Sequence, residues 1–524
     1  MNRDGSRGAA FLVGAGIFLS RIAGLVRNKF FAHYFGSSLA ADALNAAIRI
    51  PNLLQNLFGE GVLSASFIPA YSQLLAQNRK QEAERLAGVV AVTLTFISSI
   101  VVLAGILLAP SLVSIIAGGF TGPKRDLAVQ LTRILFPGAG LLVLSAWCLG
   151  ILNSHRKFFI SYTAPVLWNV AMIAALIGFG SGTPQVRLAE IVAWASVVGS
   201  AMQFGVQLPF VTQLARVKLN TAFRTESAQS VFRNFLPAFI SRGVVQISAY
   251  IDALIASWLP TGAVAVFAYA QVLYVLPVSL FGMAVSAAEL PVMSSAVGTD
   301  DEIASYLRGR LDGGLARIAF YIVPSAIGFL ALGDVMSAVL FESGRFTHAD
   351  SIWVWQILAG STVGLLASTW GRLYSSTYYA LRDTRTPLRF AVIRVVLTTA
   401  LGYLAALKLP GWLGVDPRLG VAGLTASAGI AGWVEFFLLR RGINRRIGAS
   451  GAPASVTFRL WIAAIISAAV AWGAKLILPA SHRILWGLAV LAIYGIVYLV
   501  ITTVMRIPEA SELTSRLRRR TALR

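Results

Sequence analysis

The sequence predicts an all-α polytopic membrane protein, and three observations lead to that fold class. Apolar runs of bilayer-spanning length recur from one end of the chain to the other. Hydrophobic residues make up 57% of the 524 residues and charged residues only 13%, about half the charged share of soluble domains. Basic residues gather in alternate loops. We therefore expect about fourteen transmembrane helices, arranged as two pseudo-symmetric six-helix lobes and two additional C-terminal helices.

The expected spans follow the apolar runs in order. They are centred near residues 20, 57, 99, 141, 170, 200, 246, 280, 325, 365, 398, 430, 467 and 494. The second and eighth runs are longer than a bilayer requires. A weak repeat, FGEGVLSASFIPAYS from Phe58 and FGMAVSAAELPVMS from Phe281, falls on the second span of each half. It predicts lobes at 1–215 and 216–447, followed by two extra spans and a basic tail at 448–524.

The charge distribution predicts how the chain lies in the membrane. The net charge of +22 comes mainly from loops such as 79–85, 382–389 and 440–446 and from the tail. An excess of Lys and Arg in alternate loops is typical of cytoplasmic loops, so we expect both termini in the cytoplasm and a bacterial inner-membrane location. These loops, and the terminal RLRRRTALR above all, would also attract anionic membrane lipids. Nucleic acid is not an expected partner.

The stretch from 18 to 71 places charges inside two apolar runs. Helical spacing puts Ser20 and Arg27 on one stripe with Arg21 beside it, while Arg49 and Glu60 share a face of the next run. A charge at bilayer depth is costly and usually faces a watery cavity, a partner or a substrate. We interpret these stripes as the wall of a cationic cavity for an anion. The alternative is structural: the arginines snorkel to an interface, or Arg49 pairs with Glu60.

Other charges also lie inside expected spans. Pro51 is expected to kink or break the second helix. Asp252 and Glu289 have no basic residue three or four positions away, so each is an ion-coupling candidate, or a protonated acid hydrogen-bonded between helices. We expect pairing between helices, or a position at an interface, for Arg372, Arg394 and Glu435. We expect the side chains to snorkel to an interface for Arg459 and Lys475.

The sequence argues against an enzyme. It contains no GxxxxGK[ST] loop, no HExxH and no GxSxG motif. A single cysteine, Cys148, excludes an internal disulfide and a thiolate metal cluster, and the four histidines (His33, His155, His348, His482) lack ligand spacing. We expect no metal and no cofactor. Membrane potential or an ion gradient is then the expected driving force.

Several motifs resemble one transporter family. In the first lobe they are Ser20-Arg21 through Arg27, Phe35-Gly36, Asp42-Ala43, PNLL from Pro51, Glu60-Gly61 and FIP from Phe67. Further along they are AGGF from Ala117, ILNS from Ile151, LWN ending at Asn169, QIS from Gln246, FESGRFT from Phe341 and RDTRTP from Arg382. This pattern resembles the MurJ (MviN) lipid II flippases of the multidrug/oligosaccharidyl-lipid/polysaccharide exporter superfamily, and it spans nearly the whole chain.

The resemblance implies a function and a site. Members of the family move an undecaprenyl-pyrophosphate-linked peptidoglycan precursor between leaflets by alternating access, for cell-wall synthesis and cell shape. By position, Arg21, Arg27, Arg49, Asp42 and Glu60 match residues that the family uses. Guanidinium groups bind phosphate oxygens in a fork, which suits a pyrophosphate. Cell-wall synthesis proteins are candidate partners.

The chain also departs from the family pattern. Asn28 and Gln55 replace an acid and an arginine, and Gln271-Val272 replaces an acidic-basic pair. Arg242 is an extra arginine that could compensate for a lost cation or pair with an acid on another helix. Two alternatives therefore stay open: a related exporter of another polyprenyl-linked oligosaccharide or a drug/cation antiporter, and a structural membrane protein that has lost transport.

Overall fold

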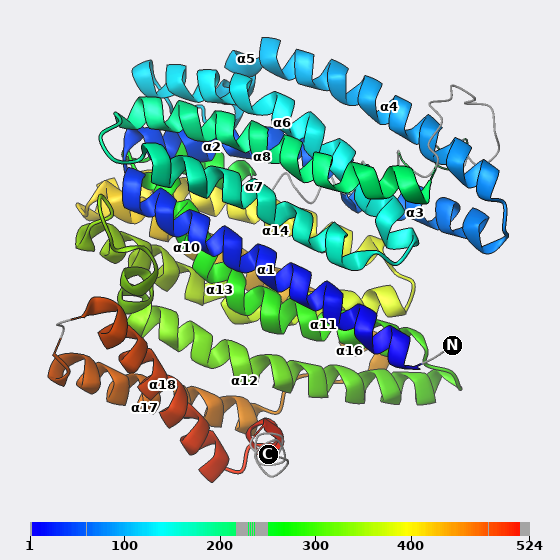
Figure 1. Cartoon of the computed structure of the whole chain (residues 1–524). Helices are drawn as coiled ribbons and strands as arrows, with labels where there is room; N and C mark the ends of the chain where they lie inside the picture. The colour runs from blue at the N-terminus through cyan, green and yellow to red at the C-terminus, as the bar shows by residue number, and fades with distance from the viewer. Residues whose placement is uncertain are drawn as a thin grey trace, which may run out of the picture. The chain divides into compact units, whose positions relative to one another are not determined.

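The fold is known from a computed structural model, which describes residues 3–58, 60–215, 229, 231, 233, 235, 250–479 and 482–513. These residues form long helices joined by short connections (Figure 1). The only strand-type contact among the described residues is an isolated bridge between Ser343 and Phe346. Helices satisfy their own backbone hydrogen bonds, which is what an apolar bilayer demands. The predicted all-α fold is confirmed.

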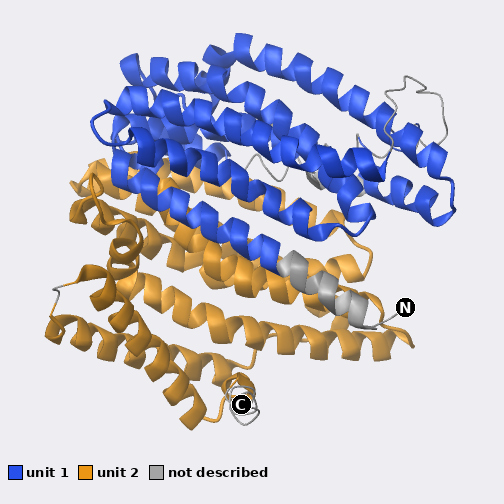
Figure 2. Cartoon of the chain, viewed as in Figure 1, with its two compact units in different colours: residues 1–265 blue, residues 266–524 orange. Residues whose placement is uncertain are grey.

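The chain divides into two compact units, residues 1–265 and 266–524 (Figure 2). Unit 1 is built from helices that run in chain order from the N-terminus. They are α1 (Arg3–Phe35), α2 (Leu39–Phe58), α3 (Glu60–Ala76), α4 (Lys80–Leu107), α5 (Ala109–Ile116), α6 (Gly122–Ser154), α7 (Phe158–Phe179) and α8 (Gln185–Leu214), with a further helical segment at 250–257.

Close helix approach organises unit 1. Helix α6 packs against α2, α4 and α8, and α7 packs against α1 and α8. Small residues permit this packing: a Cβ at Gly105 would lie 2.1 Å from the Phe136 ring, and one at Gly199 would lie 2.9 Å from Cα of Trp168. Small residues at helix interfaces are typical of membrane bundles, where backbones must come close to gain contacts. This packing brings α7, and Trp168 with it, against α1.

Unit 2 contains the remaining helices, the first of which begins in the last residues of unit 1. They are α10 (Ala263–Pro277), η1 (Val278–Met283), α11 (Ala284–Ser294), α12 (Asp300–Phe341), α13 (His348–Ala380), α14 (Arg385–Tyr403), η2 (Leu404–Lys408), α15 (Leu409–Leu413), η3 (Pro417–Leu419), α16 (Gly420–Ile447), α17 (Ala454–Ile477) and α18 (Arg483–Val504). Helices α12 and α13 are capped by Thr299 and Thr347, each in a capping box.

Helix α13 is the centre of unit 2. It packs against α12 and α16, and at Gly364 and Gly429 the α13 and α16 backbones meet: a Cβ at Gly364 would lie 2.2 Å from Cα of Gly429. Helices α17 and α18 lie against α12 (Figure 1). There Tyr494 and Tyr498 donate their hydroxyls to carbonyl oxygens of α12 at 2.7 Å. The last two spans are thus anchored to one long helix.

Eleven helices among the described residues are long and apolar enough to cross a membrane. They coincide with eleven of the expected centres, and the one near residue 280 is long, spanning Ala263–Ser294. The expected count of about fourteen is not confirmed, because the centres near 20, 57 and 246 are not among these eleven. Pro51 does not break the second helix, since α2 continues through it to Phe58. The three-part division at 215 and 447 stays a prediction.

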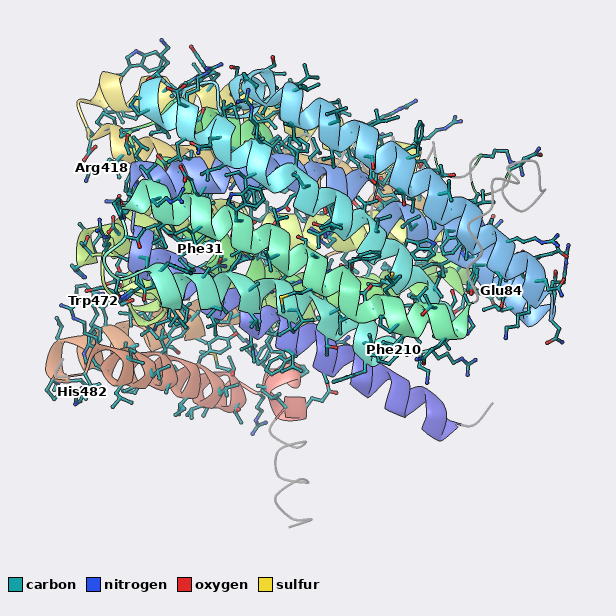
Figure 3. The ribbon with its side chains drawn as sticks, turned by 45° about the horizontal axis from the view of Figure 1, so that its top comes forward. Phe31, Glu84, Phe210, Arg418, Trp472 and His482 are labelled. Atoms are coloured by element: carbon teal, nitrogen blue, oxygen red, sulfur yellow. The ribbon has the colours of Figure 1, made fainter. Side chains whose placement is uncertain are left out.

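The labelled side chains in Figure 3 show how helix ends gather within each unit. In unit 1, Phe31 lies toward one end of the bundle, and Glu84 and Phe210 lie toward the other. In unit 2, Arg418, Trp472 and His482 lie at one end. The alternation of basic and non-basic loops predicts the same grouping of helix ends, with the end that carries Arg418, Trp472 and His482 on the outer side of the membrane. The orientation itself stays a prediction.

Candidate functional site

Arg27 on α1 is the best-defined cation of the predicted cavity. Its Cζ lies 4.8 Å from the centroid of the Trp168 ring and 5.6 Å from that of Phe31. Its Nη2 donates a hydrogen bond to Oδ1 of Asn28 at 3.1 Å. Two aromatic faces and a neutral amide orient the guanidinium without cancelling its charge. Among the described residues no carboxylate forms an ion pair with Arg27, so its charge is available to an anion.

Trp168 is itself held from the next helix. Its Nε1 donates to Oγ of Ser196 on α8 at 3.0 Å, and Ser196 is buried. The contacts therefore run from α8 through the indole on α7 to the guanidinium on α1. Sequence reasoning did not find Trp168 or Ser196, because helical spacing reports which residues share a face and not what that face meets. The LWN motif was the one available signal.

The stripe around Arg27 faces α7. A Cβ at Gly24, one turn earlier, would lie 4.0 Å from Oδ1 of Asn169. That oxygen and Nε of Arg27 are both buried and lack a hydrogen-bond partner in the described part of the chain. Unpaired buried polar atoms are rare and often belong to a site that a ligand or water completes. Of the other predicted members, Ser20 is half-buried and Arg21 is exposed.

Asp42 on α2 has a structural setting. Its buried carboxylate accepts from Nζ of Lys124 at 3.0 Å and from the backbone N–H groups of Gly262 and Ala265 at 2.7 and 2.9 Å. These N–H groups belong to the start of α10, where the first turn has no intrahelical acceptor and the helix dipole favours an anion. Asp42 therefore caps this helix start within unit 1. Its predicted role toward a substrate stays a prediction.

Arg49 and Asp252 were predicted separately and lie together in unit 1. Their opposite charges interact across the contact between α2 and the segment 250–257. At the same contact Tyr250 donates its hydroxyl to the Arg49 carbonyl oxygen at 2.9 Å. Asp252 has no basic residue three or four positions away in its own helix, but it has a basic neighbour on another helix. The side chain of Glu60 and the whole of Arg242 lie outside the described residues, so both stay predictions.

Glu289 on α11 also has basic neighbours, contrary to expectation. Its buried carboxylate accepts from Nη2 and Nε of Arg310 at 2.6 and 2.8 Å, and from Nη1 of Arg317 at 3.4 Å. Both arginines are on α12. Because two guanidiniums contact this carboxylate, Glu289 is not an isolated acid. An ion-coupling role is left as an untested prediction.

Two further ion pairs join helices of unit 2. Arg394 on α14 and Glu435 on α16 form an ion pair at 3.1 Å, as expected for an interhelical role. Lys475 was expected to snorkel, but it pairs with Asp334 on α12 at 2.5 Å. The pairing has a physical reason. Because α17 packs against α12, the Lys475 ammonium reaches the Asp334 carboxylate before it reaches an interface.

Solved structures similar to this chain show its fold. A structure titled "Lipid II flippase MurJ, inward closed conformation" aligns over 94% of this chain and 98% of its own, with a TM-score of 0.77 and 24% identity. An inward-facing multidrug resistance MATE family transporter of the MOP superfamily aligns over 81% of this chain and 95% of its own, with a TM-score of 0.64 and 19% identity. The fold is that of the MOP-superfamily transporters.

Sequence comparison narrows the class to one family. The profile described as "Lipid II flippase MurJ" matches residues 31–496. The "Lipid II flippase MurJ" of Burkholderia cenocepacia is 32% identical over 438 residues, 82% of each chain. The "Probable lipid II flippase MurJ" of Haemophilus influenzae is 30% identical over 470 residues, 87% of this chain and 90% of its own. The chain belongs to the MurJ lipid II flippase family.

Proposed function

We propose that this chain is a lipid II flippase of the bacterial inner membrane, a transporter and not a catalyst. It carries the lipid-linked peptidoglycan precursor from the inner to the outer leaflet by alternating access. Family membership supports the substrate class, and one observation supports the site: the uncancelled guanidinium of Arg27, oriented by Trp168 and Phe31. A pyrophosphate offers oxygens in the geometry that a guanidinium fork binds.

The energy for transport comes from the membrane in this proposal. Moving an anionic headgroup outward is favoured by an inside-negative potential, by about 2.3 kcal/mol per charge for each 100 mV. Asp252 stays a candidate for coupling to an ion gradient, and its carboxylate interacts with the positive charge of Arg49. Protonation of Asp252 would release Arg49, and a basic group that gains and loses its partner can bind and release an anion in turn.

Rescue of a flippase-depleted bacterium tests the proposal. The full chain is expressed in cells whose own lipid II flippase can be depleted, and the lipid II that becomes accessible on the outer face is measured. We expect restored growth and exposure, with exposure reduced at least about tenfold by Arg27→Ala. Arg187→Ala is the matched control, because it removes an exposed arginine of the same unit that pairs with Glu190 on its own helix. It should transport normally.

A second candidate function follows from the missing charges. Gln55, Gln271 and Val272 stand where the family pattern has charged residues, so the chain offers fewer cations to a pyrophosphate. This observation favours an exporter of another polyprenyl-linked oligosaccharide over a drug antiporter, because the Arg27 site still suits phosphate. Good membrane expression without lipid II exposure in the rescue experiment would support this second function and contradict the first.

A further inference from the structure

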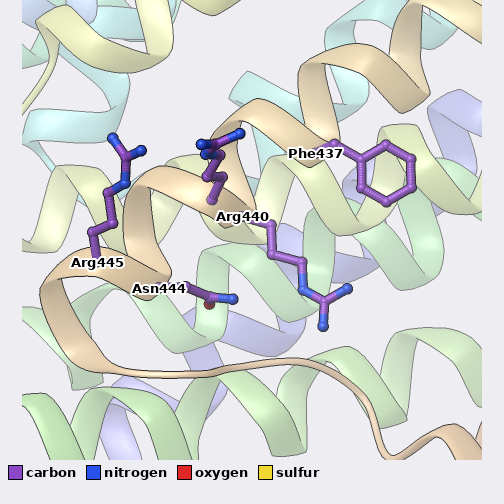
Figure 4. Close-up of a pocket in the computed structure, with 5 residues that line it drawn as sticks. Phe437, Arg440, Asn444 and Arg445 are labelled. Atoms are coloured by element: carbon purple, nitrogen blue, oxygen red, sulfur yellow. The ribbon is translucent and has the colours of Figure 1, made fainter.

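The last two turns of α16 carry a group of arginines that the transport site does not use. Arg440, Arg441 and Arg445 line an open cavity of about 470 Å³ together with Phe437 and Asn444. Figure 4 shows the labelled side chains of this group projecting from one helix end, with the Phe437 ring about one turn before the guanidiniums. We call this cavity the arginine pocket. It presents positive charge beside an apolar surface.

Two of the three charges in the arginine pocket are uncancelled. Arg446, which follows on the same helix, pairs with Asp383 at 2.7 Å. Arg440 interacts with the carboxylate of Asp312. Arg441 and Arg445 are exposed, and neither forms an ion pair with a carboxylate in the part of the chain that the structure describes. Residues four apart lie on one helix face, so their guanidiniums can converge on a single anion.

The wall of the pocket is fixed by hydrogen bonds. The Ser450 carbonyl oxygen accepts from Nε of Arg440 at 3.1 Å, and the Ser450 backbone N–H and hydroxyl donate to Oδ1 of Asn444 at 3.0 and 2.6 Å. Gly451 lets the chain pass close to Arg440, because a Cβ there would lie 3.0 Å from Nη2. Arg440 is therefore held in place, which lowers the entropy lost when a ligand binds.

A second, aromatic cavity also has Arg440 in its lining. It measures about 390 Å³, and its lining includes Trp370, Phe436, Phe458 and Trp461 as well as Arg440. Phe437 and Phe458 are 55% and 66% exposed, so apolar surface is open beside the charges. A soluble anion gains nothing from such a surface, whereas a lipid buries its acyl chain there while its headgroup meets the arginines.

We propose that the arginine pocket binds an anionic glycerophospholipid of the cytoplasmic leaflet. The headgroup phosphate lies between Arg441 and Arg445 beside Arg440, and an acyl chain runs along Phe437 into the aromatic cavity. The predicted topology places this helix end in the cytoplasm, where anionic lipids attract clustered arginines. A glycerol phosphate suits a pocket of this size, and a disaccharide-peptide headgroup is far bulkier. The proposal therefore commits to phospholipid and is independent of the flippase function.

Native mass spectrometry of the purified full chain tests the proposal. Binding of phosphatidylglycerol and of zwitterionic phosphatidylcholine is compared for the wild type and for Arg441→Gln/Arg445→Gln. The matched control is Arg385→Gln/Arg389→Gln, which removes two exposed arginines, also four apart, from the start of α14. We expect the wild type and the control to prefer phosphatidylglycerol, and the pocket variant to bind it about tenfold more weakly. Equal loss in both variants would mean that net charge alone attracts lipid, and would overturn the proposal.

Competition experiments identify the occupant. Soluble glycerol phosphate should displace phosphatidylglycerol poorly. The Phe437→Ala variant should bind phosphatidylglycerol more weakly than the wild type does, and it should still prefer phosphatidylglycerol to phosphatidylcholine. Efficient displacement by glycerol phosphate would mean that the pocket recognises only a phosphate group. Efficient displacement by undecaprenyl pyrophosphate would mean that the pocket binds the transported lipid. Either result contradicts the proposal. Because these measurements involve no transport, their failure is separate from a failure of lipid II rescue.

Discussion

Arg27 in unit 1 and the glutamates Glu289 and Glu435 in unit 2 are held in different ways. In unit 1, Arg27 is oriented by the rings of Trp168 and Phe31 and by a neutral amide. In unit 2, Glu289 and Glu435 each form ion pairs with arginines of a neighbouring helix. Paired charges hold helices together, and an uncancelled charge can attract a ligand. The comparison teaches that the partner of an intramembrane charge, more than its depth, separates a binding role from a structural one.

Asp42 should give the largest effect on stability, because it is a paired charge within unit 1. Asp42→Ala removes the partner of Lys124 and the acceptor for two N–H groups at the start of α10. We expect a loss of about 3–5 kcal/mol in the free energy of unfolding, measured in detergent. Asp416→Ala is the control, since Asp416 also accepts a backbone N–H but is exposed; it should cost about 1 kcal/mol or less. Unchanged stability with lost transport would instead assign Asp42 to the substrate.

Glu289→Gln tests how much a paired charge contributes to the stability of unit 2. The amide cannot balance Arg310 and Arg317, whose side chains are 39% and 48% exposed, so water moderates the cost. We expect a loss of about 2 kcal/mol in unfolding free energy. Glu82→Gln removes an exposed carboxylate from the pair with Arg79 and should leave stability almost unchanged, because water screens that pair. If Glu289→Gln kept full stability but abolished transport, that result would support an ion-coupling role for Glu289.

Trp168→Leu tests whether an aromatic contact orients the uncancelled charge of Arg27. Without the indole, Arg27 loses its principal aromatic contact, which in a desolvated site is worth about 1–2 kcal/mol. Lipid II exposure should fall roughly five- to thirtyfold while the thermal midpoint changes little, and Trp168→Phe should recover part of the loss because it keeps an aromatic face. Trp194→Leu, which removes an exposed tryptophan from α8, should transport normally. Equal effects of the two leucine variants would show that Trp168 does not position Arg27.

These contacts also explain what could be read from the sequence. Apolar run length found eleven spans, because a bilayer imposes one length on every helix that crosses it. The helix period placed Gly24 and Arg27 on one face, and both meet α7. The period could not supply Trp168 as the partner of Arg27 or Arg310 as the partner of Glu289, since these partners lie on other helices. Inspecting only neighbours three or four residues away made Glu289 look isolated.

Asp383 should give the smallest effect, because its charge lies outside the spans, in the connection between α13 and α14. The backbone N–H of Thr386, then its hydroxyl, and Arg446 lower the pKa of Asp383 from 3.8 to about 2. A lowered pKa in the folded protein stabilises it above the unfolded value, and that stabilisation is lost as the pH falls from about 4 through about 2. Asp383→Asn should therefore lower the thermal midpoint slightly at pH 6, and the difference from wild type should shrink below pH 4. A difference that stayed constant down to pH 2 would show that the carboxylate charge contributes nothing to this contact, and that ion pairs stabilise unit 2 only where they are buried between its helices.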